Sequence, residues 1–263
     1  MKTLDISIFS LFLCFLLLLI SFFTSFLLKL SLSKTILISV SRMTIQLILI
    51  GIFLKYLFKW NNPFINLTWL MVMIISAVYT VISTSKVKFT KFFPYAFVSF
   101  TFSTFLVILY VNKFVIRIDN IFDAKYIVVL SGMLLGNTLR SNIIGINIFY
   151  KNLRKESDQY FYILSLGATQ FEAILPYLRE SMLSALKPTL ATMATMGLVA
   201  LPGMMTGTIL GGASPITAIK YQIVIMIAIF VCTNISVLLT ILLTLKVSFN
   251  NYGILRNDFF RDK

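Results

Sequence analysis

The side chains on which most catalysis and proton transfer depend are missing from the apolar parts of this chain. There is no histidine, and all nine acidic residues lie outside the long apolar runs. Proton-coupled carriers generally relay protons through acidic or histidine side chains inside the membrane. Intramembrane hydrolases need a nucleophile with a base, or a metal with nitrogen and carboxylate ligands. The sequence therefore argues against both classes.

Two arginines, Arg42 and Arg140, are the charged residues placed well within apolar runs, since Lys55 and Lys220 lie within four residues of the end of a run. Charged groups at such positions usually face a cavity or a partner, because exposure to lipid is costly. Arg140 lies deeper than Arg42, and together with Asn137 and Gln46 it could hold an anion or a polar substrate. The alternative for Arg42, which lies near the end of its run, is that its guanidinium reaches the inner headgroups.

Another apolar run is interrupted by Pro202 and Gly203. Proline inside a helix removes one hydrogen bond and clashes with the preceding turn, so we expect a kink. In a membrane, the freed backbone groups must be satisfied by protein or line a watery cavity. The transport pathway is therefore predicted to include Arg42, Gln46, Asn137, Arg140, Pro202, Gly203, Met204, Met205, Thr206 and Gly207. The alternative is a kinked helix that only packs.

Several methionines near this break could supply sulfur ligands, with Met204 and Met205 the candidates for a metal site. Thioethers favour Cu(I) over the harder Fe(II) or Al(III). Methionine also fills apolar gaps, which is the competing interpretation. Glycines four residues apart, Gly132 with Gly136 and Gly207 with Gly211, are typical of closely packed helices.

The elements that position these residues must be membrane-spanning helices. The 263 residues are 59% hydrophobic and 12% charged, with a mean hydropathy of +0.94. Runs of roughly 20 apolar residues recur, each long enough to cross a hydrocarbon core as a helix. We expect an all-α integral membrane protein of about seven transmembrane helices, forming one permease domain over residues 1–263. The predicted spans are 6–28, 36–58, 65–83, 93–111, 126–149, 188–212 and 216–245.

The distribution of basic residues predicts the orientation. Cytoplasmic loops carry an excess of Lys and Arg. Placing the N-terminus outside and the C-terminus in the cytoplasm puts fourteen of the 23 basic residues inside and seven outside, with Arg42 and Arg140 in spans. The segment of about 150–187, between the fifth and sixth spans, is then cytoplasmic. The net charge of +14 arises from these loops and forms no basic stripe typical of nucleic-acid binding.

The cytoplasmic segment contains SLGATQFEAILPYLRESM from Ser165 to Met182. Gly167 and Ala168 open a helical stretch that runs toward Pro176, which predicts a compact knob suited to a groove on a partner. The alternative is an ordinary amphipathic linker helix. No Gly-x-x-x-x-Gly-Lys phosphate-binding loop occurs in the sequence, so any ATP would be bound by a separate chain.

The knob resembles the coupling loop of ABC import permeases, although its glycine lies about one helical turn closer to Leu-Pro. The whole set of motifs is similar to the iron-export ABC permease family (FetB-like), which is related to plant aluminium-tolerance permeases. Those motifs are Arg42 with Ile45, Gln46 and Leu47; LLGN at 134–137; SLGAT at 165–169; Lys187 with Pro188; GLVALPGMMTG at 197–207; and AIKYQI at 218–223. Arg140 departs from the family, whose members tend to have a small or neutral residue there.

This resemblance implies the membrane subunit of an ABC transporter that exports a metal ion such as iron. It implies pairing with a second copy and with ABC ATPase subunits, which would carry the ATP and magnesium, so that this chain binds no cofactor. The coupling residues would be Leu166, Gly167, Ala168, Thr169, Glu172, Leu175 and Pro176. The expected location is the lipid bilayer of the cell inner (plasma) membrane, as a multi-pass protein. The alternatives are an ATP-independent channel or facilitator and a membrane-embedded biosynthetic enzyme.

Overall fold

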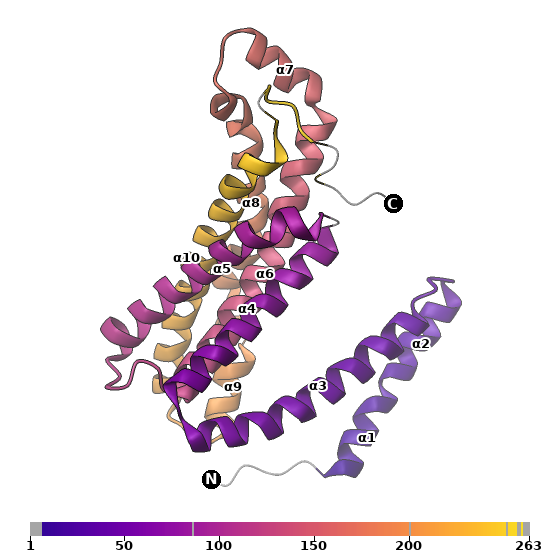
Figure 1. The fold of residues 1–263 in the computed structure, drawn as a ribbon. Helices are drawn as coiled ribbons and strands as arrows, with labels where there is room; N and C mark the ends of the chain where they lie inside the picture. The colour runs from indigo at the N-terminus through magenta and orange to yellow at the C-terminus, as the bar shows by residue number, and fades with distance from the viewer. Residues whose placement is uncertain (1–6, 86, 200, 251, 257–258, 260–263) are drawn as a thin grey trace.

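The computed structural model describes residues 7–85, 87–199, 201–250, 252–256 and 259. Every named element in this part of the chain is a helix (Figure 1). The elements are α1 (Ile8–Leu16), α2 (Leu18–Leu27), α3 (Ser33–Trp60), α4 (Pro63–Ser85), α5 (Phe89–Tyr110), the π-helix η1 (Val111–Ile116), α6 (Ala124–Lys155), α7 (Ser157–Ser165), α8 (Gln170–Thr195), α9 (Gly203–Leu210) and α10 (Pro215–Ser248).

The apolar runs fold as expected, with one exception. Six helical segments of the described chain are long and apolar enough to cross a membrane. They correspond to the first five predicted spans and the last, with α1 and α2 together forming the first and α5 with η1 the fourth.

The exception is the predicted span 188–212, which is wrong as a single helix. Pro188, its expected start, lies inside α8, which begins at Gln170 because Thr169 caps it there. The helix ends at Thr195, Gly197 adopts a φ of +88°, and helix resumes only at Gly203, after Pro202. The positive φ of Gly197 and the extended backbone of Pro202, which caps α9, are both non-helical, so the expected kink is a complete break.

Helices α4 to α10 form a bundle in which α6 packs against α4, α8 and α10 (Figure 1). Helices α8 and α9 follow one another from the end that carries α7 to the opposite end, beside α10. Helices α1 to α3 form an arm that extends away from this bundle, and α3 makes few contacts with α6. In the arm, the described buried side chains are Ser25 and Leu57. Most of its apolar surface is thus open to its surroundings.

A ladder of polar side chains joins α6 to α10. The Asn142 amide donates to the Ser236 hydroxyl at 3.0 Å, and the Thr138 and Thr233 hydroxyl oxygens are 3.4 Å apart. Between the helices, a Cβ added at Gly145 would lie 2.8 Å from Cγ1 of Val237. Small residues and polar pairs of this kind hold membrane helices together. Of the glycines predicted to pack, Gly136 and Gly207 instead face open space.

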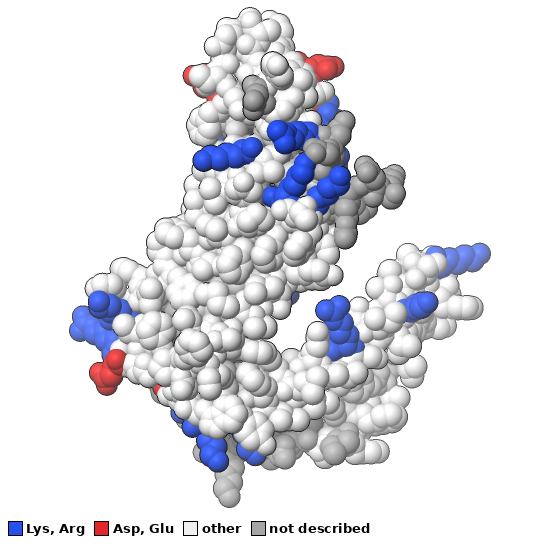
Figure 2. Space-filling model, viewed as in Figure 1, with Lys and Arg blue, Asp and Glu red and all other residues white. Residues whose placement is uncertain are grey.

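Most basic residues lie near the ends of the helices, with Arg42 and Arg140 among the exceptions. Figure 2 shows Lys and Arg at both ends of the bundle and on the arm, with a nearly uncharged belt across the bundle between them. This belt is the part of the surface that matches a hydrocarbon core. At the end that carries α7, the buried ring of Phe259 packs against Phe92 and Tyr150, and its backbone carbonyl accepts a hydrogen bond from Lys88.

Candidate functional site

A cavity of about 510 Å³, here called the central cavity, opens where α8 breaks. It is lined by four segments of chain: the middle of α6, the last part of α8, the break with the start of α9, and α10. The described residues that line it are Met133, Asn137, Arg140, Ser141, Ile144, Pro188, Thr189, Thr192, Met196, Pro202, Gly203, Met204, Gln222, Ile225, Met226 and Ile229.

The polar side of the central cavity is built around Arg140. Asn137, Arg140 and Ser141 lie three and four positions apart, so they share one face of α6. Among the described residues, the Arg140 guanidinium and the Ser141 and Thr189 hydroxyl groups have no hydrogen-bonding partner. Ser141 and Thr189 are nevertheless 4% and 8% exposed. Neither hydroxyl oxygen is among the fully buried unpaired atoms of the described residues, so both groups reach the cavity surface and are available to a ligand.

The apolar side of the same cavity carries four methionines, Met133, Met196, Met204 and Met226. The Met196 sulfur accepts a long hydrogen bond of 3.7 Å from the Gln222 amide. No group of three or more His, Cys, Asp or Glu residues that could hold a metal ion exists among the described residues. Thioether sulfur atoms are therefore the only soft ligands that this lining offers. Its hydroxyl and amide oxygens are hard ligands.

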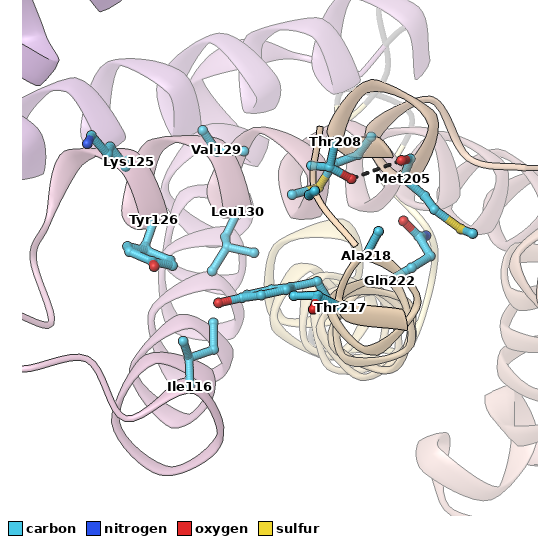
Figure 3. Close-up of a pocket in the computed structure, with 13 residues that line it drawn as sticks. Ile116, Lys125, Tyr126, Val129, Leu130, Met205, Thr208, Thr217, Ala218 and Gln222 are labelled. Carbon is cyan, nitrogen blue, oxygen red and sulfur yellow. Dashed lines mark hydrogen bonds between the residues drawn. The ribbon is translucent and has the colours of Figure 1, made fainter. Parts of the chain in front are cut away.

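A second cavity of about 240 Å³, here called the end cavity, lies nearer the starts of α6 and α10 (Figure 3). Tyr126 and Leu130 of α6 face Thr217 and Ala218 of α10 across it, and Met205 and Thr208 of α9 close another side. The Thr208 hydroxyl donates to the Met205 carbonyl at 2.9 Å, which ties the side chain to its own helix. Met204 and Gln222 line both cavities, so they form the partition between them.

The structure brings together half of the residues predicted for a pathway. Asn137, Arg140, Pro202, Gly203 and Met204 line the central cavity, and Met205 lines the end cavity. Thr206 and Gly207 line neither of them. Arg42 and Gln46 are exposed on α3, in the arm, and the structure does not bring them to either cavity.

Several lining residues were missed by the sequence analysis. Gln222, Ser141 and Thr189 are ordinary polar residues within helices, and nothing in their spacing marks them. The signal that could have found them is a helical face: Ser141 lies four residues after Asn137, and Thr189 lies three before Thr192. Such faces become informative only when the neighbouring helix is known.

The predicted coupling element forms a tight turn followed by a capped helix. Gly167 has a φ of +90°, which favours glycine, and Thr169 is the N-cap of α8. The Thr169 hydroxyl accepts from the Glu172 backbone N–H, and the Glu172 carboxylate accepts from the Thr169 backbone N–H at 2.7 Å. This reciprocal pair is a capping box. Hydrogen bonds from the Thr169 hydroxyl and backbone lower the pKa of Glu172 below its ordinary value.

Apolar side chains surround this turn and are exposed. Leu166 is 70% exposed, Tyr162 64% and Phe171 53%. We call Tyr162, Leu166 and Phe171 the apolar knob. Behind it, Tyr177 donates a hydrogen bond of 3.3 Å to the Glu156 carbonyl, and burial together with the nearby Glu156 carboxylate raises the pKa of Tyr177. The knob is thus a cluster of exposed apolar side chains, and the Tyr177 hydrogen bond holds the helix behind it in place. Exposed apolar clusters of this kind are typical of interaction sites.

Leu175 and Pro176, the other predicted coupling residues, lie in the second turn of α8. The helix continues through Pro176 to Thr195, although we expected a short helical stretch that runs toward this proline. The helical part of the predicted coupling element, with Glu172, Leu175 and Pro176, consequently belongs to the same helix as the lining residues Thr189 and Thr192.

Comparison with known proteins places these features in a family context. Residues 8–249 match the family described as "Uncharacterised protein family (UPF0014)". The chain is similar to "Probable iron export permease protein FetB" of Escherichia coli K12, with 32% identity over 227 residues that cover 85% of each chain. It is 31% identical to "UPF0014 membrane protein YjkA" of Bacillus subtilis, over 84% of this chain and 88% of that one. Similarity extends to "Protein ALUMINUM SENSITIVE 3" of Arabidopsis thaliana, with 32% identity over 75% of this chain and 71% of the relative. No solved structure matches the chain.

Proposed function

Since this chain belongs to the UPF0014 family of membrane proteins, we propose that it is the membrane subunit of an ABC transporter. In this proposal it exports a metal ion such as iron across the inner (plasma) membrane, driven by ATP hydrolysis on a separate subunit. Iron export is named in the E. coli relative and is carried over as part of the proposal. A second copy would complete the membrane part.

The observation that carries the proposal is the course of α8. This helix begins at the capping box beside the apolar knob and reaches the central cavity with Thr189 and Thr192. Its 26 residues span about 39 Å at the usual rise of an α-helix. A displacement of the knob by a partner is therefore delivered to the cavity wall by one helix, without an intervening loop.

The knob has the properties of a docking surface for an ATPase subunit. It is apolar and exposed at the end of the bundle that the basic residues predict to be cytoplasmic. Exposing an apolar cluster to water at the end of a membrane protein costs free energy, and a partner that covers the cluster removes this cost. The Gly167 turn and the capped start of α8 give the cluster a defined shape.

The two cavities suit transport by alternating access. They lie on opposite sides of a partition formed by Met204 and Gln222, at a break in the helix path. In transporters, cargo sites commonly lie at broken helices, where non-helical backbone lines a cavity. A shift of α8 relative to α6 would change the central cavity first, and a shift of α9 would open the partition.

The test is co-purification and transport with an ABC ATPase subunit from the same organism. The full chain and that subunit are co-expressed, extracted in detergent and reconstituted in vesicles loaded with iron. We expect the ATPase subunit to be retained and iron efflux to require ATP. Replacing Leu166 with Glu should abolish retention, because a charge in an apolar docking surface opposes burial. Replacing Leu183, an exposed residue farther along α8, with Glu is the matched control.

Two results would contradict the proposal. Iron flux at full rate without any ATPase would establish a channel or facilitator. Chemical turnover of a lipid or sugar carrier by the purified chain alone would establish an enzyme. Retention of the ATPase by the Leu166→Glu variant would instead show that the knob is not the docking surface.

A further inference from the structure

The charge of the central cavity restricts what it can bind. Arg140 contributes a guanidinium, which stays protonated in proteins. None of the described residues that line the cavity is acidic, and the chain has no histidine. The cavity therefore carries a positive charge without a counter-charge, midway along a helix that is long and apolar enough to cross a membrane.

A bare metal cation is a poor ligand for this site. Fe(II) and the harder Al(III) take carboxylate, imidazole or water ligands, and the lining offers no carboxylate or imidazole. The four thioethers are weak ligands for hard metals. A bare cation would also be repelled by the positive charge of Arg140, which lines the cavity and is exposed in the single chain.

An oxyanion fits the same groups well. The Arg140 guanidinium has five N–H donors in a planar fork that matches carboxylate and phosphate. Ser141 and Thr189 are largely buried residues whose hydroxyl groups have no partner among the described residues, and the Gln222 amide has only a long contact to sulfur. Donors from α6, α8 and α10 thus converge on one cavity. Its volume of about 510 Å³ suits a small organic ligand and far exceeds that of a single ion.

We propose that cargo enters the central cavity as an anion, through carboxylate or phosphate oxygens bound by Arg140 with support from Ser141 and Thr189. In this inference, which rests on the proposed function, exported metal travels as an anionic complex with a small chelator. The methionines then contact the apolar part of the chelator and do not coordinate the metal.

The test is equilibrium binding to the full chain in lipid nanodiscs with radiolabelled probes. The probes are ferric citrate, citrate without metal, inorganic phosphate and Fe(II) without chelator. We expect at least one of the three anionic probes to bind, and Fe(II) alone not to bind. The pattern among citrate, ferric citrate and phosphate identifies which oxyanion the site prefers.

Variants then assign the binding to Arg140. The change Arg140→Gln should weaken anion binding at least about tenfold, because a charged hydrogen bond is lost. Arg140→Lys should have a smaller effect, since it keeps the charge but loses the fork. Thr189→Val, which removes one hydroxyl at nearly constant volume, should weaken binding less than Arg140→Gln. The control is Arg42→Gln, on the exposed face of α3, which should bind as the unmodified chain does.

Two outcomes overturn the inference. One is binding of Fe(II) alone that is unchanged or strengthened in Arg140→Gln. The other is anion binding that Arg140→Gln and Arg42→Gln reduce equally, which would reflect surface charge. The ATPase subunit is assayed on the same preparations. If it is retained and hydrolyses ATP while Fe(II) alone binds, only the inference on cargo fails; if it is not retained, the proposed function fails regardless of binding.

Discussion

Thr169 and Thr192 lie on the same helix at opposite ends of the proposed coupling path. Thr169 closes the capping box beside the apolar knob, and Thr192 lines the central cavity. The helix that joins them contains Pro176 and Pro188, and it remains assigned as helix through both. Each proline removes one backbone hydrogen bond, so the helix is connected along its length but can bend at two defined positions.

The capping box predicts a dependence of the α8 start on pH. Glu172 has a lowered pKa in the folded chain, so the stabilisation it gives is present above the ordinary pKa and is lost as pH falls through the folded value. We expect NMR of the labelled carboxyl to show a lower pKa in the unmodified chain than in Thr169→Val. The protection of amides 170–174 against hydrogen exchange, relative to their intrinsic rates at each pH, should fall in acid in the unmodified chain. Equal Glu172 pKa values in the two chains would show that Thr169 does not hold the carboxylate.

The close approach of α6 and α10 at Gly145 predicts a steric effect. A Cβ at this position would lie 2.8 Å from Val237 and 3.4 Å from the Cβ of Ala185, so Gly145→Ala should destabilise the fold by about 1–3 kcal/mol. Thermal unfolding in detergent measures the loss. Combining Gly145→Ala with Val237→Ala should recover part of it. The matched control, Gly136→Ala, meets nothing within 4 Å and should be neutral or slightly stabilising.

The polar ladder predicts a smaller effect at Asn142. Its amide donates to Ser236 at 3.0 Å and to the Thr138 carbonyl at 2.9 Å, and its side chain is fully buried. Replacing it with Leu should cost about 1–2 kcal/mol, in the range measured for such bonds within membranes. The same change at exposed Asn147, on the same helix, is the control. An equal loss of stability at both positions would show that the hydrogen bonds of the polar ladder do not stabilise the fold.

The partition predicts that Met204 limits leakage between the cavities. Because Met204 lines both cavities and Met205 lines only the end cavity, Met204→Ala should raise ATP-independent flux of cargo while Met205→Ala should not. Flux from loaded vesicles, measured without the ATPase subunit, reports the difference. A leak of the same size in both variants would mean that the α9 side chains do not form a gate between the cavities.

The sequence predicts the helical class and most of the spans because a run of about 20 apolar residues can cross a membrane only if its backbone hydrogen bonds are satisfied, which a helix achieves within the run itself. It fails at 188–212, where apolar composition continues through Gly197 and Pro202 although the helix does not. At the candidate site it identifies Arg140 and Asn137, which stand out as polar residues in an apolar run. Gln222, Ser141 and Thr189 become visible only when α6, α8 and α10 are placed beside one another.

The most direct test of the coupling path is the accessibility of a single cysteine at Thr192 in the chain with its ATPase subunit. Cys14, which is exposed, is first replaced with Ser, and buried Cys232 is retained. We predict that the labelling rate at position 192 changes severalfold between nucleotide-free and ATP-bound states, and that Leu166→Glu abolishes the change. An unchanged labelling rate in a complex that hydrolyses ATP would contradict the proposal that α8 transmits motion from the apolar knob to the central cavity.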